Sequence, residues 1–565
     1  MSIDFRNVAI KKTGFPSNPD YGVKRMNFQK ISSVALIVMC LAGMVLMFAR
    51  IGSVRSLSHD GAISILAATG NLKAYSEEGP RNALVRASEW QKYWKIHSPG
   101  CFRRISRDLA NKDIHPPLYF WALHVWFLGL GLSIQKALWL NVVCQLLAAV
   151  VIARCCVRLS CPLWLSVWSA SMWFFNNANM SVGMEVRQYS MLSLFSIVFM
   201  LNLLNFLKLP EKRNAGWLGL ALLAGMLVHY HFWLLALIAI GLVSLQISLR
   251  REWKTLKYLF GASVGSCILF YSLHPGFLLS FQRQSAQSQS FSWVSAAERL
   301  TLARYTFWRQ FLDSSPFEFV FSRLDRFWPY SGLFMLILAL MIIVRFFKSP
   351  FSKGIRACVF SDKTIPFVSA LVCVAVIIAL YVSCQSPSHA MGPKYLMLTS
   401  PLIAVGIGQL LNYISISGNR TVLVFALVLL VSQVMASLED TVKFVYANQD
   451  VELAGIDKPS ATVLLDSTAR GILPVILWHA DPDASVFAGS QETIIQLEKW
   501  DFPFDKKLTY ISNLSYGNTL QGADFILQHL MNNELVFQKR YTGLPWRAFT
   551  FEFIPKEINI IEYPE

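Results

Sequence analysis

The sequence predicts a polytopic α-helical membrane protein that ends in a small α/β domain. The chain has 565 residues, of which 54% are hydrophobic and only 15% are charged, a balance outside the range of soluble globular proteins. Its apolar residues gather in runs close to the roughly 20 residues that cross a bilayer. After Asp440 the hydropathy falls, and short strand-like runs alternate with helical ones, which indicates a separate unit outside the membrane.

Charge and cysteine usage exclude several other classes of protein. The net charge is +17, but many Lys and Arg residues lie in short runs between apolar segments, where they orient a membrane protein. No basic face with interleaved aromatic residues is seen in a soluble region, so nucleic acid is not a predicted partner. The ten cysteines are mostly inside apolar runs, which predicts neither a disulfide framework nor a structural metal site.

The connecting charges decide which apolar runs cross the membrane. If Pro116–Ser133 is an interfacial helix rather than a span, the basic clusters between the spans all fall on one side. The positive-inside rule then favours about eleven spans, with the N-terminus in the cytoplasm and the C-terminus outside. The first run has no convincing cleavage site, so we expect a retained signal anchor. The predicted spans are 33–50, 137–153, 163–176, 190–207, 215–230, 232–249, 258–275, 328–347, 364–384, 395–413 and 421–437.

This topology divides the chain into three parts. We expect a cytoplasmic tail at 1–32, a transmembrane unit at 33–440 and an outer α/β domain at 441–565, with long outer loops at 51–135 and 276–327. The first loop is rich in Lys and Arg, which suits either a face that binds solvent or lipid headgroups or a cradle for phosphate groups. The outer domain has no Gly-rich phosphate loop, so we interpret it as a lid or a platform that positions an acceptor. Its predicted strands are 461–466, 484–488, 508–512, 534–538 and 548–554, with helices near 469–479, 491–500 and 520–531.

Several polar residues lie where spans reach the outer surface, and each has a structural explanation when taken alone. Asp60 follows the first span by ten residues and could cap a helix. Asp113 and His115 precede Pro117, which starts the interfacial helix. Glu185 and Arg187 could form an ion pair at a span boundary, and Lys394 could extend towards the headgroups. His229 and His231 would suit a metal only if further ligands joined them.

All these groups share one predicted face of the membrane. Carboxylates, a histidine, an arginine and a lysine that converge there suit displacement at a sugar carbon with a lipid phosphate as leaving group. A carboxylate would take the proton of the acceptor hydroxyl, and the cations would neutralise the departing phosphate. Nucleotide sugars are absent from the outer compartment, so a lipid-carried donor is the natural activated substrate.

Four motifs in order resemble the GT-C superfamily of integral membrane glycosyltransferases over roughly 30–440. The similarity is to the bacterial dolichyl-phosphate-mannose-protein mannosyltransferase-like branch (families 39 and 83) that includes the aminoarabinose transferases of lipid A. The motifs are SLSHDGAIS at 56–64, HPPLY at 115–119, EVRQY at 185–189 and KYL at 394–396. The first resembles the Asp-Glu motif of the family's first outer loop, and the second is the most specific.

The resemblance implies a GT-C fold, a polyprenyl-phosphate sugar donor and an outward-facing site. Carried over to this chain, Asp60 would be the catalytic base and Glu185 the second acidic residue. The donor would be bound by Asp113, His115, Tyr119, Arg187, Tyr189, Lys394 and Tyr395. Two positions depart from the family pattern. Gly61 replaces the usual Glu, and Lys394 replaces the commoner Arg, which exchanges a bidentate fork for a point charge.

We therefore expect an inverting glycosyltransferase of the bacterial inner membrane that acts at the periplasmic face. Its partners would be the lipid bilayer, a polyprenyl-phosphate sugar and a cell-envelope acceptor, which could be lipid A, O-antigen, another glycan or protein. No cofactor is implied, although Mg²⁺ or Mn²⁺ stays open because carboxylates at the site could bind either. The alternatives are a flippase for lipid-linked glycans, which should carry charges or broken helices at the bilayer midplane, and an inactive scaffold.

Overall fold

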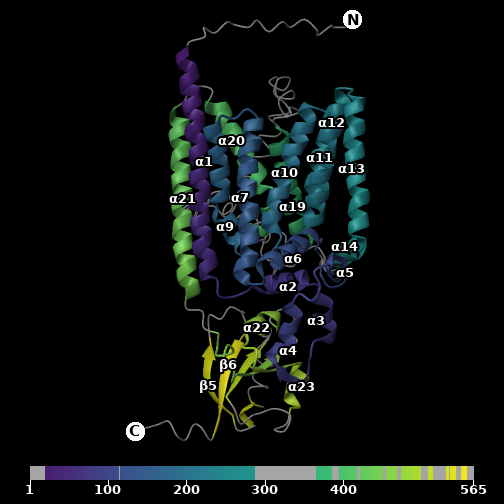
Figure 1. Ribbon diagram of the computed structural model, residues 1–565, viewed down its shortest axis with the longest axis vertical. Coiled ribbons are helices and arrows are strands. Elements are labelled where there is room, and N and C mark those ends of the chain that lie inside the picture. Colours follow the sequence, from purple (N-terminus) through teal and green to yellow (C-terminus); the bar gives the residue numbers. More distant parts are fainter. Residues whose placement is uncertain are drawn as a thin grey trace.

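The computed structural model describes most of the predicted membrane unit and parts of the C-terminal region. The described residues are 19–113, 115–286, 364–384, 393–415, 420–449, 453–466, 473–497, 507–512, 528, 530–532, 535–541 and 549–556. In Figure 1, long helices stand side by side in a bundle, a β-sheet lies beyond one end of it, and short helices lie between the two. The predicted span 328–347 falls outside the described residues, so the number of eleven spans stays a prediction.

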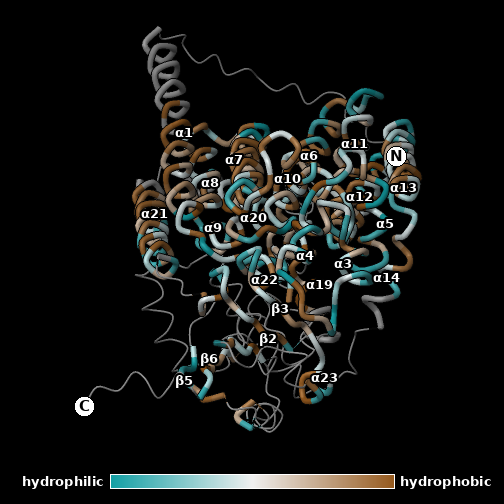
Figure 2. Tube along the Cα trace, turned by 60° about the horizontal axis from the view of Figure 1, so that its bottom comes forward, coloured by the Kyte–Doolittle hydropathy of each residue, from teal (hydrophilic) through white to brown (hydrophobic). Residues whose placement is uncertain are grey.

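The bundle is built from helices that match the predicted apolar runs. Four described helices are long and apolar enough to cross a membrane, namely α7 (Ile134–Arg158), α10 (Tyr189–Lys208), α12 (His231–Leu249) and α13 (Trp253–Leu273). Beside them run α1 (Pro19–Ser53), α8 (Leu163–Phe174), α9 (Asn177–Gly183), α11 (Lys212–Val228), α19 (Ile365–Cys384), α20 (Ser400–Ser415) and α21 (Arg420–Gln449). In Figure 2, hydrophobic residues are most prominent along α1 and α21.

The predicted span 163–176 is observed as α8, which ends at Phe174. A separate short helix follows, because Asn176 caps α9 by accepting the backbone N–H groups of Ala178 and Asn179. An Asn side chain that satisfies the free N–H groups of a helix start is a typical helix boundary. The α9 helix leads the chain into the turn that carries Glu185 and Arg187.

The helices alternate in direction as the charge pattern predicts. At one end of the bundle, Arg158 Nε donates to Asn205 Oδ1 at 2.8 Å, and Asn412 Nδ2 donates to the Ser160 carbonyl at 3.4 Å. The predicted site residues Asp60, Arg187 and Lys394 meet one another instead, next to the short helices. That the segment 116–133 does not cross the membrane stays a prediction. Which end faces the cytoplasm stays a prediction.

The short helices form a layer between the bundle and the sheet (Figure 1). They are α2 (His59–Ala68), α3 (Leu72–Glu78), α4 (Ala87–Gln91), η2 (Lys92–Trp94), α5 (Phe102–Lys112), α6 (Leu118–Leu130) and α14 (Phe277–Ala286). The indole N–H groups of α6 bond to neighbouring backbone, from Trp121 to the Phe102 carbonyl at 3.0 Å and from Trp126 to the Lys136 carbonyl at 2.7 Å. Asp60 belongs to this layer, because it lies in the first turn of α2.

Within the described ranges, the sheet has six strands in the order β1-β3-β2-β4-β6-β5. Five lie within a few residues of their predicted positions, namely β2 (Thr462–Asp466), β3 (Ser485–Gly489), β4 (Leu508–Ser512), β5 (Leu535–Tyr541) and β6 (Phe549–Pro555). The predicted helices at 469–479 and 491–500 are represented by α22 (Leu473–His479) and α23 (Gln491–Ile495), and most of 520–531 lies outside the described residues.

One strand of the sheet comes from the first outer loop. β1 (Leu84–Arg86) pairs antiparallel with β3, with Leu84 opposite Phe487. The sheet is thus shared between the first loop and the C-terminal region, a link that the sequence analysis does not predict. It ties the layer of short helices to the sheet by backbone hydrogen bonds.

Candidate functional site

Asp60 is held at the start of α2 and points towards two cations. Ser58, not Asp60, caps the helix, since its side chain accepts the Gly61 N–H at 3.1 Å. The Asp60 carboxylate is therefore available, and it lies 2.7 Å from Arg187 Nη2 and 3.6 Å from Lys394 Nζ. Burial raises the pKa of Asp60, but Arg187 and Lys394 lower it by more, so that the pKa is about 2. Asp60 is ionised at neutral pH.

Arg187 lies at the centre of the site, in the turn between α9 and α10. Its side chain is only 8% exposed, and Nη1 is 3.9 Å from Asp113 Oδ2. Burial lowers the pKa of Arg187, but the charges of Asp60 and Asp113 raise it by more. Nε and Nη1 have no hydrogen-bond partner among the described residues. Buried guanidinium N–H groups are costly when unpaired, so they suit an anionic ligand.

Asp113 and His115 form a second acidic group beside Arg187. His115 Nδ1 lies 2.8 Å from Asp113 Oδ1, and both side chains are largely buried. Asp113 follows the end of α5, and Pro117 caps α6, so the two flanking helices fix the pair in place. Arg187 thus stands between two carboxylates that come from opposite ends of the first outer loop.

Lys394 enters from η3 (Pro393–Leu396). Its ammonium lies 5.9 Å from the ring centroids of both Tyr189 and Tyr395, within the range of cation–π attraction. The two rings restrict the lysine to the side of Asp60. The predicted residues Tyr189 and Tyr395 therefore belong to the site as walls around the cation.

Glu185 lies two residues before Arg187 and forms no ion pair among the described residues. Burial raises the pKa of Glu185, as does the nearby charge of Asp60, while Lys394 and Arg187 lower it only in part. The two acidic residues thus have opposite environments, since Asp60 is paired and fully ionised and Glu185 has a raised pKa. Such a pair suits a division of labour between two carboxylates.

Tyr119 occupies a different place from the other predicted residues. Its side chain is fully buried, and its hydroxyl donates to Asn141 Oδ1 at 3.2 Å. Asn141 Nδ2 in turn donates to the backbone carbonyl of Glu185. Tyr119 therefore contributes to the site indirectly, because it supports the turn that carries Glu185 through Asn141. Asn141 on α7 belongs to this network too, although no motif in the sequence marks it.

His229 and His231 join the site from the turn between α11 and α12. The His229 ring centroid lies 4.7 Å from that of His231, 5.8 Å from Tyr189 and 5.9 Å from His115. The His231 N–H donates to His229 Nδ1 at 3.1 Å, which places the proton of a neutral His229 on Nε2. In the sequence, the position of His229 and His231 at the outer end of a helical hairpin indicated that they could lie near the site. Within the described ranges, no three His, Cys, Asp or Glu side chains are arranged to hold a metal ion.

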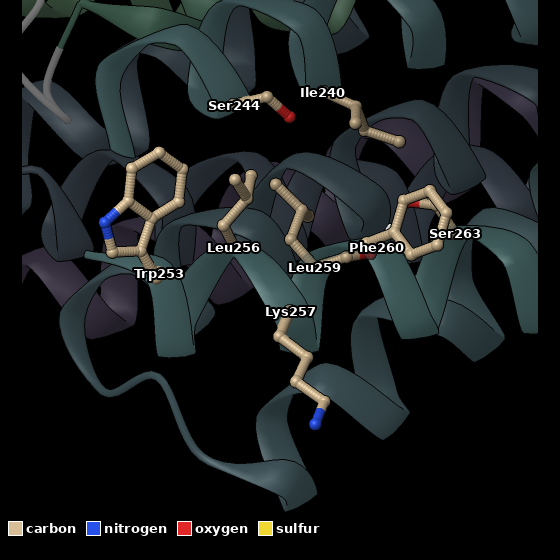
Figure 3. Close-up of a pocket in the computed structure, with 8 residues that line it drawn as sticks. All are labelled: Ile240, Ser244, Trp253, Leu256, Lys257, Leu259, Phe260 and Ser263. Carbon is tan, nitrogen blue, oxygen red and sulfur yellow. Dashed lines mark hydrogen bonds between the residues drawn. The ribbon is translucent and has the colours of Figure 1, made fainter. Parts of the chain in front are cut away.

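A separate pocket lies towards the other end of the bundle. It measures about 410 Å³ between α12 and α13 and is lined by Ile240, Ser244, Trp253, Leu256, Lys257, Leu259, Phe260 and Ser263. Figure 3 shows the Lys257 ammonium directed away from the apolar side chains. Neither Asp60, Arg187 nor Lys394 lines this pocket, so we do not interpret it as the active site.

Comparison with known proteins supports the fold. No protein-family model and no curated protein matches the sequence. Two solved structures match over almost the whole chain. ArnT from Cupriavidus metallidurans bound to undecaprenyl phosphate has a TM-score of 0.50 and 13% identity, covering 91% of this chain and 97% of its own. The same protein in the apo state has a TM-score of 0.51 and 11% identity, covering 92% and 98%. The chain therefore shares the fold of these two ArnT structures.

Proposed function

We propose that this protein is a membrane glycosyltransferase that moves a sugar from a polyprenyl-phosphate donor to a cell-envelope acceptor. The observation that carries the proposal is Arg187, a buried guanidinium 2.7 Å from the Asp60 carboxylate, whose Nε and Nη1 make no hydrogen bond within the described part of the chain. A phosphate suits the free donors of the guanidinium, and a carboxylate beside it suits a general base. The shared fold with ArnT, solved with undecaprenyl phosphate, supports the same class of donor here.

The charges of the site favour a reaction in which donor binding activates the base. With its pKa near 2, Asp60 is a weak base while Arg187 and Lys394 neutralise it. A donor phosphate that engages these two cations would weaken their hold on Asp60 and raise its affinity for a proton. The carboxylate is then able to accept the proton of an acceptor hydroxyl.

The transfer itself is a single displacement. The acceptor oxygen forms a bond to the anomeric carbon as the bond to the phosphate oxygen breaks, and the configuration inverts. Asp60 takes the hydroxyl proton, and the electron pair leaves on the lipid phosphate, whose charge Arg187 and Lys394 neutralise. Glu185 is the second carboxylate of the site. Asp113 and His115 hold Arg187 in place and shape the donor pocket. In this proposal the site faces the periplasm of a bacterial inner membrane.

A transfer assay tests the proposal. Purified protein is incubated with radiolabelled polyprenyl-phosphate sugars and with lipid A, O-antigen, other glycan or protein acceptors, with and without Mg²⁺ or Mn²⁺. We expect turnover by the wild type and a loss of at least about 100-fold in Asp60→Asn. Asp440→Asn is a matched control, because Asp440 pairs with Arg50 at the same 2.7 Å distance outside the site.

Two outcomes would contradict the proposal. Full transfer by a folded, membrane-inserted Asp60→Asn protein would show that Asp60 is not the base. Donor binding without any turnover by the wild type would favour a flippase or an inactive scaffold instead of an enzyme.

A further inference from the structure

A histidine at the end of α22 contacts the segment just before the helix that carries Asp60. His479 is the last residue of α22, and its Nε2 accepts the backbone N–H of Leu57 at 3.1 Å. The two residues are 422 positions apart in the chain. This hydrogen bond joins the C-terminal region to the segment just before α2.

Leu57 in turn contacts the immediate neighbour of Asp60. The Leu57 side chain is buried, and its Cδ1 lies only 2.9 Å from where a Cβ would stand on Gly61. The next residue, Ser58, caps α2 by accepting the Gly61 N–H. Leu57, Ser58 and Gly61 thus form a close-packed turn around the start of α2. Leu57 therefore packs against the start of the helix that carries Asp60.

His479 is in the right state to accept a hydrogen bond. Burial lowers the pKa of His479 to about 4, although the charge of Asp457 raises it slightly. The imidazole is neutral at neutral pH, and a neutral ring has one nitrogen that can accept an N–H. Because the Leu57 N–H occupies Nε2, the ring proton resides on Nδ1.

The helix that carries His479 is itself anchored to the first loop. Gln91 Nε2 donates to the carbonyls of Leu477 at 3.0 Å and Ala480 at 2.8 Å. The rings of Trp94 and Trp478 meet edge to face, with centroids 6.0 Å apart. These contacts stabilise the docking of α22 against the first loop, whereas the bond to Leu57 is made by the His479 ring itself.

We propose that His479 is a positioning residue for Asp60, through which α22 aligns the base by way of the Leu57 backbone. The inference rests on the proposed function and gives the C-terminal region a part in the reaction. His479 does not touch the substrate in this proposal. Its contribution is to the orientation of Asp60, so its loss should affect the rate of the transfer step more than donor binding.

Three substitutions at this position separate the acceptor from the bulk of the ring. His479→Phe keeps the volume of the ring and removes the acceptor. His479→Asn has a side chain too short for its oxygen to reach the Leu57 N–H, whereas His479→Gln places an oxygen close to the position of Nε2. Loss of one neutral hydrogen bond corresponds to about a fivefold effect. We expect kcat to fall about fivefold in the Phe and Asn variants with donor KM within about twofold, and the Gln variant to retain near wild-type kcat.

Gln91→Leu is the matched control, because it removes the other hydrogen bonds to the same helix end and leaves the Leu57 contact in place. It should lower the thermal stability without lowering kcat per folded molecule. Amide hydrogen exchange of peptides over 55–61, measured on the full chain in nanodiscs, is the second readout. Exchange there should be faster in His479→Phe and unchanged in His479→Gln and Gln91→Leu.

The outcomes separate this proposal from the proposed function. Equal losses in the Gln and Phe variants, a Gln91→Leu effect as large as that of His479→Phe, or unchanged exchange over 55–61 in His479→Phe would each overturn the role of His479. Absence of transfer by the wild type would overturn the proposed function alone. The exchange measurements would then still decide whether His479 holds the Leu57 segment.

Discussion

Arg187 Nη2 lies 2.7 Å from Asp60 Oδ1, and the guanidinium that makes this contact is almost completely buried. The pair joins the turn before α10 to the start of α2. Because the same cation also faces Asp113, the charges of the site are balanced before any ligand arrives. An incoming phosphate would enter a site whose cations are already in position.

Substitution of Arg187 should weaken donor binding. Hydrogen bonds to a charged group contribute about 1.5–3 kcal/mol, so Arg187→Ala should bind polyprenyl phosphate roughly 10- to 100-fold more weakly. Arg187→Lys should be intermediate, since a point charge replaces the fork. Titration of the purified protein with the lipid measures the affinity. Arg103→Ala, on the exposed side of α5, is the control, and an unchanged affinity in Arg187→Ala would exclude this phosphate site.

The pH dependence of transfer should report Glu185 rather than Asp60. Burial raises the pKa of Glu185, so protonation of this residue begins at a higher pH than for an ordinary Glu. Asp60, with a pKa of about 2, stays ionised throughout that range. We expect kcat/KM to fall as the pH falls through the raised pKa of Glu185, and the inflection to be absent in Glu185→Gln. An identical acid limb in that variant would assign the titration to another group.

Gly61 should not accept the Glu that is usual in the family. A Cβ at this position would meet Leu57 Cδ1 at 2.9 Å and Ser58 Oγ at 3.1 Å. Gly61→Glu should therefore reduce the stability by about 1–3 kcal/mol and lower transfer. In a Leu57→Ala background the added cost should be smaller, because the clash is relieved. Thermal melts of the four proteins complete the double-mutant cycle, and strict additivity would contradict this explanation.

The ion pair between Arg50 and Asp440 should contribute to the stability of the protein but not to catalysis. Arg50 is 0% exposed, whereas Asp440 is 40% exposed, so solvent weakens the pair. Removing the carboxylate in Asp440→Ala still leaves a buried cation, and we expect a loss of about 1–3 kcal/mol. Glu439→Ala breaks a fully surface pair with Lys443 and should cost below about 0.5 kcal/mol. Equal melting temperatures for the two variants would contradict the difference.

The parts of the fold that depend on local pattern were predictable from the sequence. A long apolar run has few alternatives to a membrane helix, and the strands β2, β3 and β4 are short runs with buried side chains throughout or nearly so. β1 was missed because three residues, two of them exposed, carry no strand pattern of their own. Its pairing with β3 depends on a partner some four hundred residues away.

The candidate site was predictable to the extent that topology decides it. Charges placed at one face of the membrane converge when the helices alternate in direction, which brought Asp60, Arg187 and Lys394 together. Side-chain direction was not predictable, since it depends on how each helix is rotated against its neighbours. That is why Tyr119 turns into the core towards Asn141, and why His229 and His231 pack against Tyr189 and His115.

The sharing of the sheet between distant segments has a consequence for how the protein matures. β1 is synthesised early and β3 late, and 422 residues separate Leu57 from His479. Contacts of such high sequence separation close last, because the intervening chain must be ordered first. A chain truncated before α22 would lack both the β1–β3 pairing and the His479 bond to Leu57, so the segment before Asp60 would be held less firmly until α22 and β3 have been synthesised.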